Sequence, residues 1–281
     1  MALSTPASSH LRNPEGPRAQ DLQALRRAIQ AIERKTVTIE GAAAVLPFGI
    51  AEIDQILGGG LAPAALHEIA AGNETQIAAA TGFTLALASR APATVLWIAE
   101  EMTGRESGTP YGPGLDEIGL APERLVLVKV VHARDLLWAM EEALHCRAVG
   151  AVIGELRSAR VIGDVAARRL SLAATERGGL ALLLRTTPAV EATPADTRWI
   201  IAPAASAPSR HGIGPPAFAV QLVRNRRGVL GSWMLEWDCV DQRFHLSPAY
   251  PQPVAMPAFD GPALNLAPLA GRGRPRASAV G

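Results

Sequence analysis

The sequence predicts an α/β protein with a mostly parallel, twisted sheet, helices on both faces of that sheet, and an antiparallel hairpin near the C-terminus. Two patterns support this prediction. From Phe48 onward, apolar runs of strand length alternate with longer runs of helix length. The shorter runs are almost continuously apolar, which is typical of strands buried on both faces of a parallel sheet. Strands that alternate with helices form βαβ units, in which helices cover the sheet.

Residue types that end helices set the boundaries of these elements. Glycines at 58–60 end an amphipathic first helix, Pro122 ends a short later helix, and glycines at 178–179 end the last one. The helix at 77–90 consists largely of alanine and leucine. The expected helices span 50–57, 77–90, 115–120, 133–146 and 161–176. The expected strands of the parallel part span 66–70, 95–99, 125–130, 150–154 and 180–184.

The pattern changes after residue 198. Three further runs, at 199–202, 217–224 and 230–237, are predicted to be antiparallel. The last two are joined by Asn-Arg-Arg-Gly at 225–228, and Asn and Gly tolerate the positive φ angles of tight hairpins.

Tryptophan side chains on the last strand offer two interpretations. Trp233, Leu235 and Trp237 share one face of that strand because side chains alternate along it. They either cover the core or form an aromatic anchor for a partner protein. Trp97 and Trp138 are expected in the core.

Composition divides the chain into one domain with a segment on each side. Residues 41–250 form the expected domain, which fits a chain of 281 residues. Residues 1–40 are expected to be mobile around an amphipathic helix at about 17–34, which either caps its own domain or docks on a neighbouring protein. Residues 251–281 form a Pro/Gly/Ala-rich tail expected to be disordered. The apolar stripe of the helix consists of Leu22, Leu25, Ile29 and Ile32.

Charge and cysteine content disfavour several classes of function. The net charge of +1 is too small for strong DNA binding by the field of the whole molecule. Cys146 and Cys239 are expected to be buried and lack metal-ligand spacing, and the six histidines are scattered, so no metal site is expected. The N-terminus lacks an export signal and no apolar run could span a bilayer, so a cytoplasmic location is expected.

The expected phosphate-binding loop is missing after the first strand. Such loops read G-x-x-x-x-G-K-[ST], because backbone N–H groups, a lysine and a hydroxyl hold the phosphates and magnesium. Here Gly72 is followed by Asn-Glu-Thr-Gln-Ile-Ala, and no lysine or arginine occurs in residues 46–89. The chain has only two lysines, Lys35 and Lys129, and neither follows a glycine-rich turn. We therefore expect no nucleotide, metal or other cofactor, and no catalytic residue.

Several segments, in this order, resemble the RecA-like core and more narrowly the ImuA family, whose members are RecA-related, SulA-like proteins. The resemblance covers about residues 46–246 and depends on the order and spacing of its pieces. These are FGIAEIDQILGGGL leading into LHEIAA, then VLWIAEE, AVGAVIGE and AFAVQLVRNRRGVLGSWMLEW.

The resemblance also implies roles for particular residues. Glu101 or Glu100 stands where RecA-type enzymes keep the carboxylate that polarises water, and Glu155 stands where the magnesium-associated aspartate lies. Without a bound γ-phosphate such carboxylates have no catalytic task, so we interpret them instead as carboxylates at strand ends, where loops emerge. Arg224, Arg226 and Arg227 match basic residues near nucleotide between subunits, and form either a solvated hairpin tip or a contact for an acidic partner or phosphate.

The function implied by the resemblance is a non-catalytic RecA-like adaptor in SOS-induced error-prone translesion synthesis. Its expected partners are an ImuB-like inactive Y-family polymerase and an error-prone replicative-type polymerase subunit, with RecA as a further candidate. DNA contact is expected to be indirect, because the 186–198 segment is short, nearly neutral and lacks stacking aromatics. Two alternatives are an ATPase with an unconventional phosphate site and a SulA-like inhibitor of cell division.

Overall fold

The computed structural model describes residues 45–103, 108–146, 148–157, 164–177, 179–189, 193–206 and 214–247. The expected amphipathic helix at 17–34, with Leu22, Leu25, Ile29 and Ile32, lies outside these residues. So does the expected disordered tail at 251–281.

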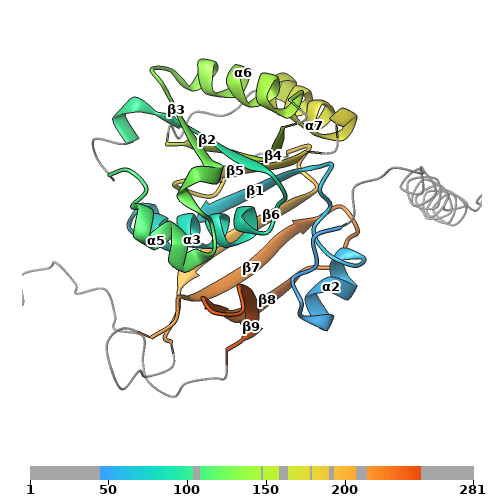
Figure 1. The fold of residues 1–281 in the computed structure, drawn as a ribbon. Coiled ribbons are helices and arrows are strands. Elements are labelled where there is room, and N and C mark those ends of the chain that lie inside the picture. The colour runs from blue at the N-terminus through green and yellow to red at the C-terminus, as the bar shows by residue number, and fades with distance from the viewer. Residues whose placement is uncertain are drawn as a thin grey trace, which may run out of the picture.

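A nine-stranded mixed sheet forms the centre of the fold, in the order β3-β2-β4-β5-β1-β6-β7-β8-β9 (Figure 1). The first six strands in this order are parallel to their neighbours, and β7, β8 and β9 continue the sheet in antiparallel fashion. The strands are β1 (Leu66–Ala71), β2 (Thr94–Glu100), β3 (Leu125–Val130), β4 (Val149–Leu156), β5 (Leu180–Arg185), β6 (Thr197–Pro203), β7 (Ala217–Asn225), β8 (Gly231–Asp238) and β9 (Arg243–Leu246).

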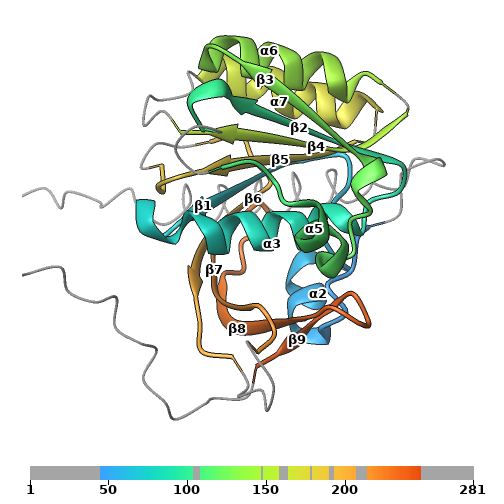
Figure 2. The ribbon, with the colours of Figure 1, turned by 60° about the vertical axis from the view of Figure 1, so that its left-hand side comes forward.

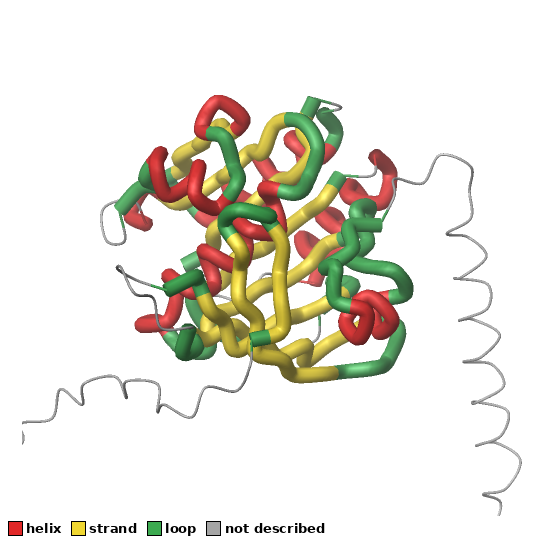
Figure 3. The backbone as a smooth tube through the Cα atoms, turned by 60° about the horizontal axis from the view of Figure 1, so that its bottom comes forward, coloured by secondary structure: helices red, strands yellow, loops and turns green. Residues whose placement is uncertain are grey.

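Helices cover both faces of the parallel part. In Figure 2, α3 and α5 lie on one side of the sheet, and α6 and α7 lie side by side on the other. With the lower end turned forward, strands occupy the middle of the view and helices lie around them (Figure 3). The helices are α2 (Ala51–Leu57), α3 (Ile77–Ser89), α5 (Gly112–Ile118), α6 (Ala133–Leu144) and α7 (Asp164–Arg177), with 3-10 turns η1 (Glu74–Gln76) and η2 (Pro122–Arg124).

This architecture confirms the predicted α/β class, the parallel sheet and the C-terminal hairpin, with two differences. The strand expected at 199–202 was assigned to the antiparallel part, but β6 pairs in parallel with β1 and antiparallel only with β7. It is therefore the strand at which the sheet changes direction. The four-residue strand β9 was not expected at all, and it pairs antiparallel with β8.

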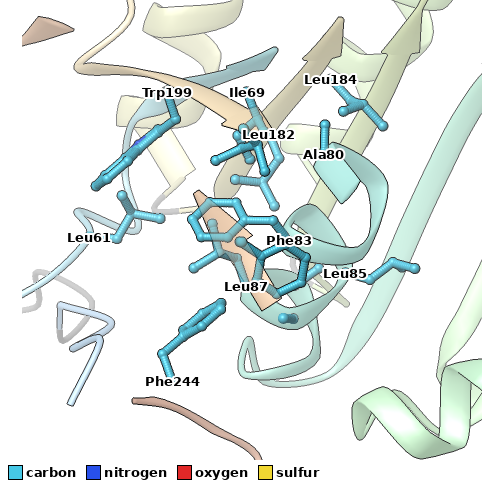
Figure 4. Close-up of a cluster of buried hydrophobic side chains, with 14 of the residues drawn as sticks. Leu61, Ile69, Ala80, Phe83, Leu85, Leu87, Leu182, Leu184, Trp199 and Phe244 are labelled. Atoms are coloured by element: carbon cyan, nitrogen blue, oxygen red, sulfur yellow. The ribbon is translucent and has the colours of Figure 1, made fainter. Parts of the chain in front are cut away.

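An aromatic cluster centred on Phe83 packs α3 onto the sheet. The Phe83 ring centroid lies 5.3 Å from that of Phe244, 5.8 Å from that of Phe218 and 6.1 Å from that of Trp199. Figure 4 shows Phe83 from α3 meeting Trp199 and Phe244 from the strands. Because the rings come from α3, from β6 and from the antiparallel strands β7 and β9, they join the parallel and antiparallel parts of the sheet in one core.

Of the four tryptophans whose environment the sequence analysis discusses, three lie in the core and Trp138 does not. Trp233 and Trp237 are buried, and Leu235 between them contributes to the same core, so this face covers the core and is no partner anchor. Trp97 is buried as expected. Trp138 was expected in the core, but 61% of its surface is exposed.

Trp138 is exposed because of its position on α6. The face of α6 that packs on the sheet carries Leu136, Met140 and Leu144, spaced by four residues. Trp138 follows Leu136 by two residues and therefore lies well away from this face of the helix. Cys146, also expected to be buried, is exposed because it lies beyond the last turn of α6.

Truncation of Phe83 tests whether the aromatic cluster holds the fold. We expect Phe83→Ala to lower the free energy of unfolding by about 3–5 kcal/mol, because it leaves a cavity among packed rings. Urea denaturation would measure the loss. Tyr111→Ala is a matched control, since Tyr111 is 73% exposed, and should cost less than about 0.5 kcal/mol. A Phe83→Ala loss below about 1 kcal/mol would contradict the central role of this ring.

Candidate functional site

The edge formed by the carboxyl ends of the parallel strands is where ligands bind in open α/β sheets. Strands β1, β2, β4 and β5 all end at this edge, because they run in the same direction. In register, β5 lies between β1 and β4. The edge therefore brings together the loop after β1 and the carboxylates that follow β2 and β4.

The loop between β1 and α3 is held closed by its own hydrogen bonds. Asn73 Oδ1 accepts hydrogen bonds from the Thr75 backbone N–H at 3.0 Å and from the Thr75 hydroxyl at 2.6 Å. The Gly72 N–H donates to the Ile201 carbonyl and the Gln76 N–H donates to the Asn73 carbonyl, both at 3.0 Å. Three backbone donors of the loop are thus used within the protein.

A side chain also occupies the space next to Gly72. A Cβ placed on Gly72 would lie 2.5 Å from Gln76 Oε1, so the Gln76 amide lies directly over this glycine. Glu74 adds an exposed acidic side chain to the same turn. Arg90, the first cation after the loop, follows the other end of α3. The loop therefore offers an anion neither free backbone donors at these positions nor a nearby positive charge from α3.

The two carboxylates implied by the resemblance lie in different environments from one another. Glu155 on β4 is buried, and its Oε2 accepts a hydrogen bond of 3.2 Å from Trp97 Nε1. Burial raises the pKa of Glu155, opposed by the Trp97 hydrogen bond and by nearby Arg157. Glu100 at the end of β2 has one buried carboxylate oxygen without a hydrogen-bond partner, whereas Glu101 is exposed.

A small cavity separates these groups. Glu100, Glu155 and Thr103 line a space of about 20 Å³, and the buried Thr103 hydroxyl has no hydrogen-bond partner. A space of this size accommodates about one water molecule, whereas ligand pockets measure roughly 300–1,000 Å³. Among the residues described, no group of three or more His, Cys, Asp or Glu side chains is placed to hold a metal ion. The carboxylates are thus packed at a strand edge without room for a nucleotide between them.

One cation at this edge was missed by the sequence analysis. Arg185 ends β5, is buried, and lies in register with Ala70 of β1 and Leu156 of β4. The expected strand ended one residue earlier, at Leu184. An arginine directly after an apolar run was the signal that could have identified it.

A buried ion pair fixes the segment after β5. Glu68 on β1 bonds Arg198 Nε on β6 at 2.6 Å and accepts a 2.6 Å hydrogen bond from the Thr193 hydroxyl. Arg198 also donates to the Ala189 carbonyl at 2.9 Å. Ala189 and Thr193 are therefore both hydrogen-bonded to side chains of the sheet. These bonds disfavour a large rearrangement of the described part of this segment around DNA.

The three hairpin arginines lie at the β7–β8 turn, far from the β1–α3 loop. Residues Arg224 and Asn225 pair with Arg198 and Thr197 at the start of β6, whereas the loop follows the end of β1. The Arg224 Nε–H donates to the Ala195 carbonyl at 3.0 Å. Arg226 and Arg227 are exposed, and the Arg227 guanidinium packs on Gly58 after α2. Within one chain, these arginines therefore lie near the amino ends of the parallel strands, whereas the loop lies at their carboxyl ends.

Replacement of Glu155 distinguishes a structural carboxylate from one that needs its charge. Its raised pKa means that ionisation in the folded state costs free energy, a cost that is absent at low pH and appears as the pH rises above 4.5. We expect Glu155→Gln to raise the free energy of unfolding at pH 8, and the gain to shrink towards pH 4.5, as measured by denaturation at each pH. Glu123→Gln, at an exposed position, is the control. A loss of stability at pH 8 would show that the ionised carboxylate is held by favourable contacts.

Comparison with known proteins identifies the family. Protein ImuA of Caulobacter vibrioides strain NA1000 / CB15N is 33% identical over 211 residues, which is 68% of this chain and 83% of that protein. Protein ImuA from a second strain of the same species matches to the same extent. No family model matches the chain. In the part of the chain that the structure describes, no helix is long and apolar enough to cross a membrane. By its extended similarity to these relatives, the chain belongs to the ImuA family.

Proposed function

We propose that this protein is a non-catalytic RecA-like adaptor for SOS-induced error-prone translesion DNA synthesis. The observation that carries the proposal is the closed β1–α3 loop, in which Asn73 and Gln76 take the place of a phosphate-binding arrangement. Phosphoryl transfer depends on positioning and neutralising the transferred phosphate. A RecA-like core that lacks this capacity keeps its surfaces but cannot switch by hydrolysis.

The proposed partners follow from membership in the ImuA family. They are an ImuB-like inactive Y-family polymerase and an error-prone replicative-type polymerase subunit, with RecA as a further candidate because the cores have similar architecture. Contact with DNA is proposed to be indirect. A net charge of +1 and the tied segment after β5 both support this view.

Three surfaces are candidates for these contacts. The hairpin arginines Arg226 and Arg227 are exposed and could meet an acidic surface. The segment 17–34 and the tail 251–281 lie outside the described residues, and their composition suits binding that is coupled to folding. Arg224 is a poorer candidate because its guanidinium supports the Ala195 carbonyl.

Nucleotide binding separates the adaptor from an ATPase with an unconventional phosphate site. A ligand that binds only the folded protein raises its apparent stability, by about 2.7 kcal/mol at a concentration 100 times its Kd. We expect no increase in Tm at millimolar ATP with magnesium, measured by thermal shift. A P-loop ATPase of known affinity serves as the positive control. A stabilisation that saturates with ATP would contradict the non-catalytic assignment.

Association with polymerases tests the adaptor role directly. We expect the purified full-length protein to retain the ImuB-like protein and the error-prone polymerase subunit in a pull-down, and deletion of its gene to lower damage-induced mutagenesis. Arg226→Ala/Arg227→Ala, compared with an Arg243→Ala control at another exposed position, tests the hairpin as a contact. Filamentous growth on overexpression, with unchanged mutagenesis and no retained polymerase, would instead support the SulA-like alternative.

A further inference from the structure

Residues of α6 and α7 line a groove. These two helices cover the face of the sheet opposite α3 (Figure 2). The volume of the groove is about 320 Å³, and Leu137, Trp138 and Ala166 contribute its apolar surface. The groove is far larger than the cavity beside Glu155, and the two share no lining residue.

Large apolar side chains extend this surface along both helices. Exposed fractions are 61% for Trp138 on α6, and 74% and 62% for Val165 and Leu172 on α7. Val165 and Leu172 are seven residues apart and therefore lie on the same face of α7, two turns from each other. An exposed apolar strip of this kind on a charged surface marks a binding site for another apolar surface.

The charged residues that line the groove are paired, and one ion pair joins α7 to α6 across it. Arg169 contacts the Glu141 carboxylate at 2.6 Å, and Arg134 lies 3.5 Å from Asp135. The described lining therefore contributes two positive and two negative charges, which gives the groove no strong preference for an acidic or a basic ligand. What the groove selects for is an apolar stripe, as a helix presents when it docks between two other helices.

We propose that residues 17–34 of this same chain dock in the α6–α7 groove as a helix, with the stripe of Leu22, Leu25, Ile29 and Ile32 against Trp138. The stripe is spaced for one helix face. The tail at 251–281 is a poorer occupant, because proline and glycine interrupt it and large apolar side chains are few. The proposal does not depend on the polymerase pathway.

The start of the described chain lies close enough for this contact. Leu46 pairs with Leu61, and three residues later the Ala64 carbonyl accepts a hydrogen bond from Thr175 on α7. The path from Leu46 along this segment and up α7 to Arg169 is roughly 25 Å, from strand and helix dimensions. The ten residues 35–44 can extend to roughly 33 Å. The linker therefore spans the distance without being fully stretched.

Because the linker is short, even a weak intrinsic affinity gives high occupancy of the groove. A linker of this length gives an effective concentration on the order of 1 mM. A helix that binds with an intrinsic Kd of about 0.1 mM would then occupy the groove about 90% of the time. A helix held in this way competes with any partner that uses either the same stripe or the same groove.

Tryptophan fluorescence reports on the contact in the full-length protein. Trp97, Trp199, Trp233 and Trp237 are buried, so acrylamide quenching reflects mainly Trp138. We expect Leu25→Asp/Ile29→Asp to raise the quenching constant several-fold, because the stripe no longer covers Trp138. Gln23→Asp/Gln30→Asp adds the same charge to the polar face of the expected helix and should leave quenching unchanged. Both variants are repeated in a Trp138→Phe background, where the difference should disappear.

The outcomes decide between occupants. An increase that is specific to the stripe, requires Trp138 and is independent of protein concentration supports docking within one chain. An increase that appears only at high concentration, with dimers by light scattering, assigns the groove to a second copy and overturns the proposal. Equal quenching in all variants leaves Trp138 open to another protein and also overturns it. If the stripe variant and the polar-face variant still differ in acrylamide quenching when Trp138 is replaced by Phe, the difference reports a general loss of structure. That result also counts against the contact.

Discussion

The packing of α3 against the sheet is the constraint on which the rest of the structure depends. Phe83 joins this helix to rings from β6, β7 and β9, and β1 is buried among parallel neighbours. Only five residues connect β1 to α3, so both ends of the loop are fixed by apolar packing. The RecA-like shape therefore needs no bound nucleotide to hold it. Asn73 and Gln76 could replace phosphate-binding residues without loss of the framework, because the core and not the ligand places the helix.

Local patterns predicted most of the fold, and distant contacts explain what they missed. The strand at 125–130 was predicted with its observed bounds because it is a short apolar run with clear ends, although β3 lies at the edge of the sheet and has no fully buried residue. The direction of β6 could not be read locally, since its parallel partner β1 lies about 130 residues earlier. For the site, the residue types at 72–78 predicted a loop without the phosphate-binding sequence pattern. The Gln76 side chain over Gly72, the buried Arg185 and the remote position of the hairpin all depend on tertiary register.

The use of arginine in this chain fits a protein that holds its own backbone rather than a phosphate. Arg124 donates to the carbonyls of Ser89, Ala91 and Ala93, where α3 turns into β2. Arg198 and Arg224 fix the segment between β5 and β6 in the same way. The planar guanidinium can bond several carbonyls at once, whereas a lysine presents a single flexible charge. Arg124, Arg198 and Arg224, three of the 25 arginines in the chain, therefore direct their donors to carbonyls of the protein itself.

The separation of the two sheet edges limits how such a protein can be regulated. In a single chain the hairpin arginines and the β1–α3 loop lie at opposite ends of the parallel strands. Binding at one end can therefore affect the other end only through the sheet between them. The parallel part of that sheet carries a hydrophobic core on each face, so a change there would require repacking of the core. The α6–α7 surface differs, because its exposed Trp138, Val165 and Leu172 lie outside the core and can be covered or uncovered without repacking it. Control by competition at this surface needs no hydrolysis, which suits a core whose phosphate loop is closed.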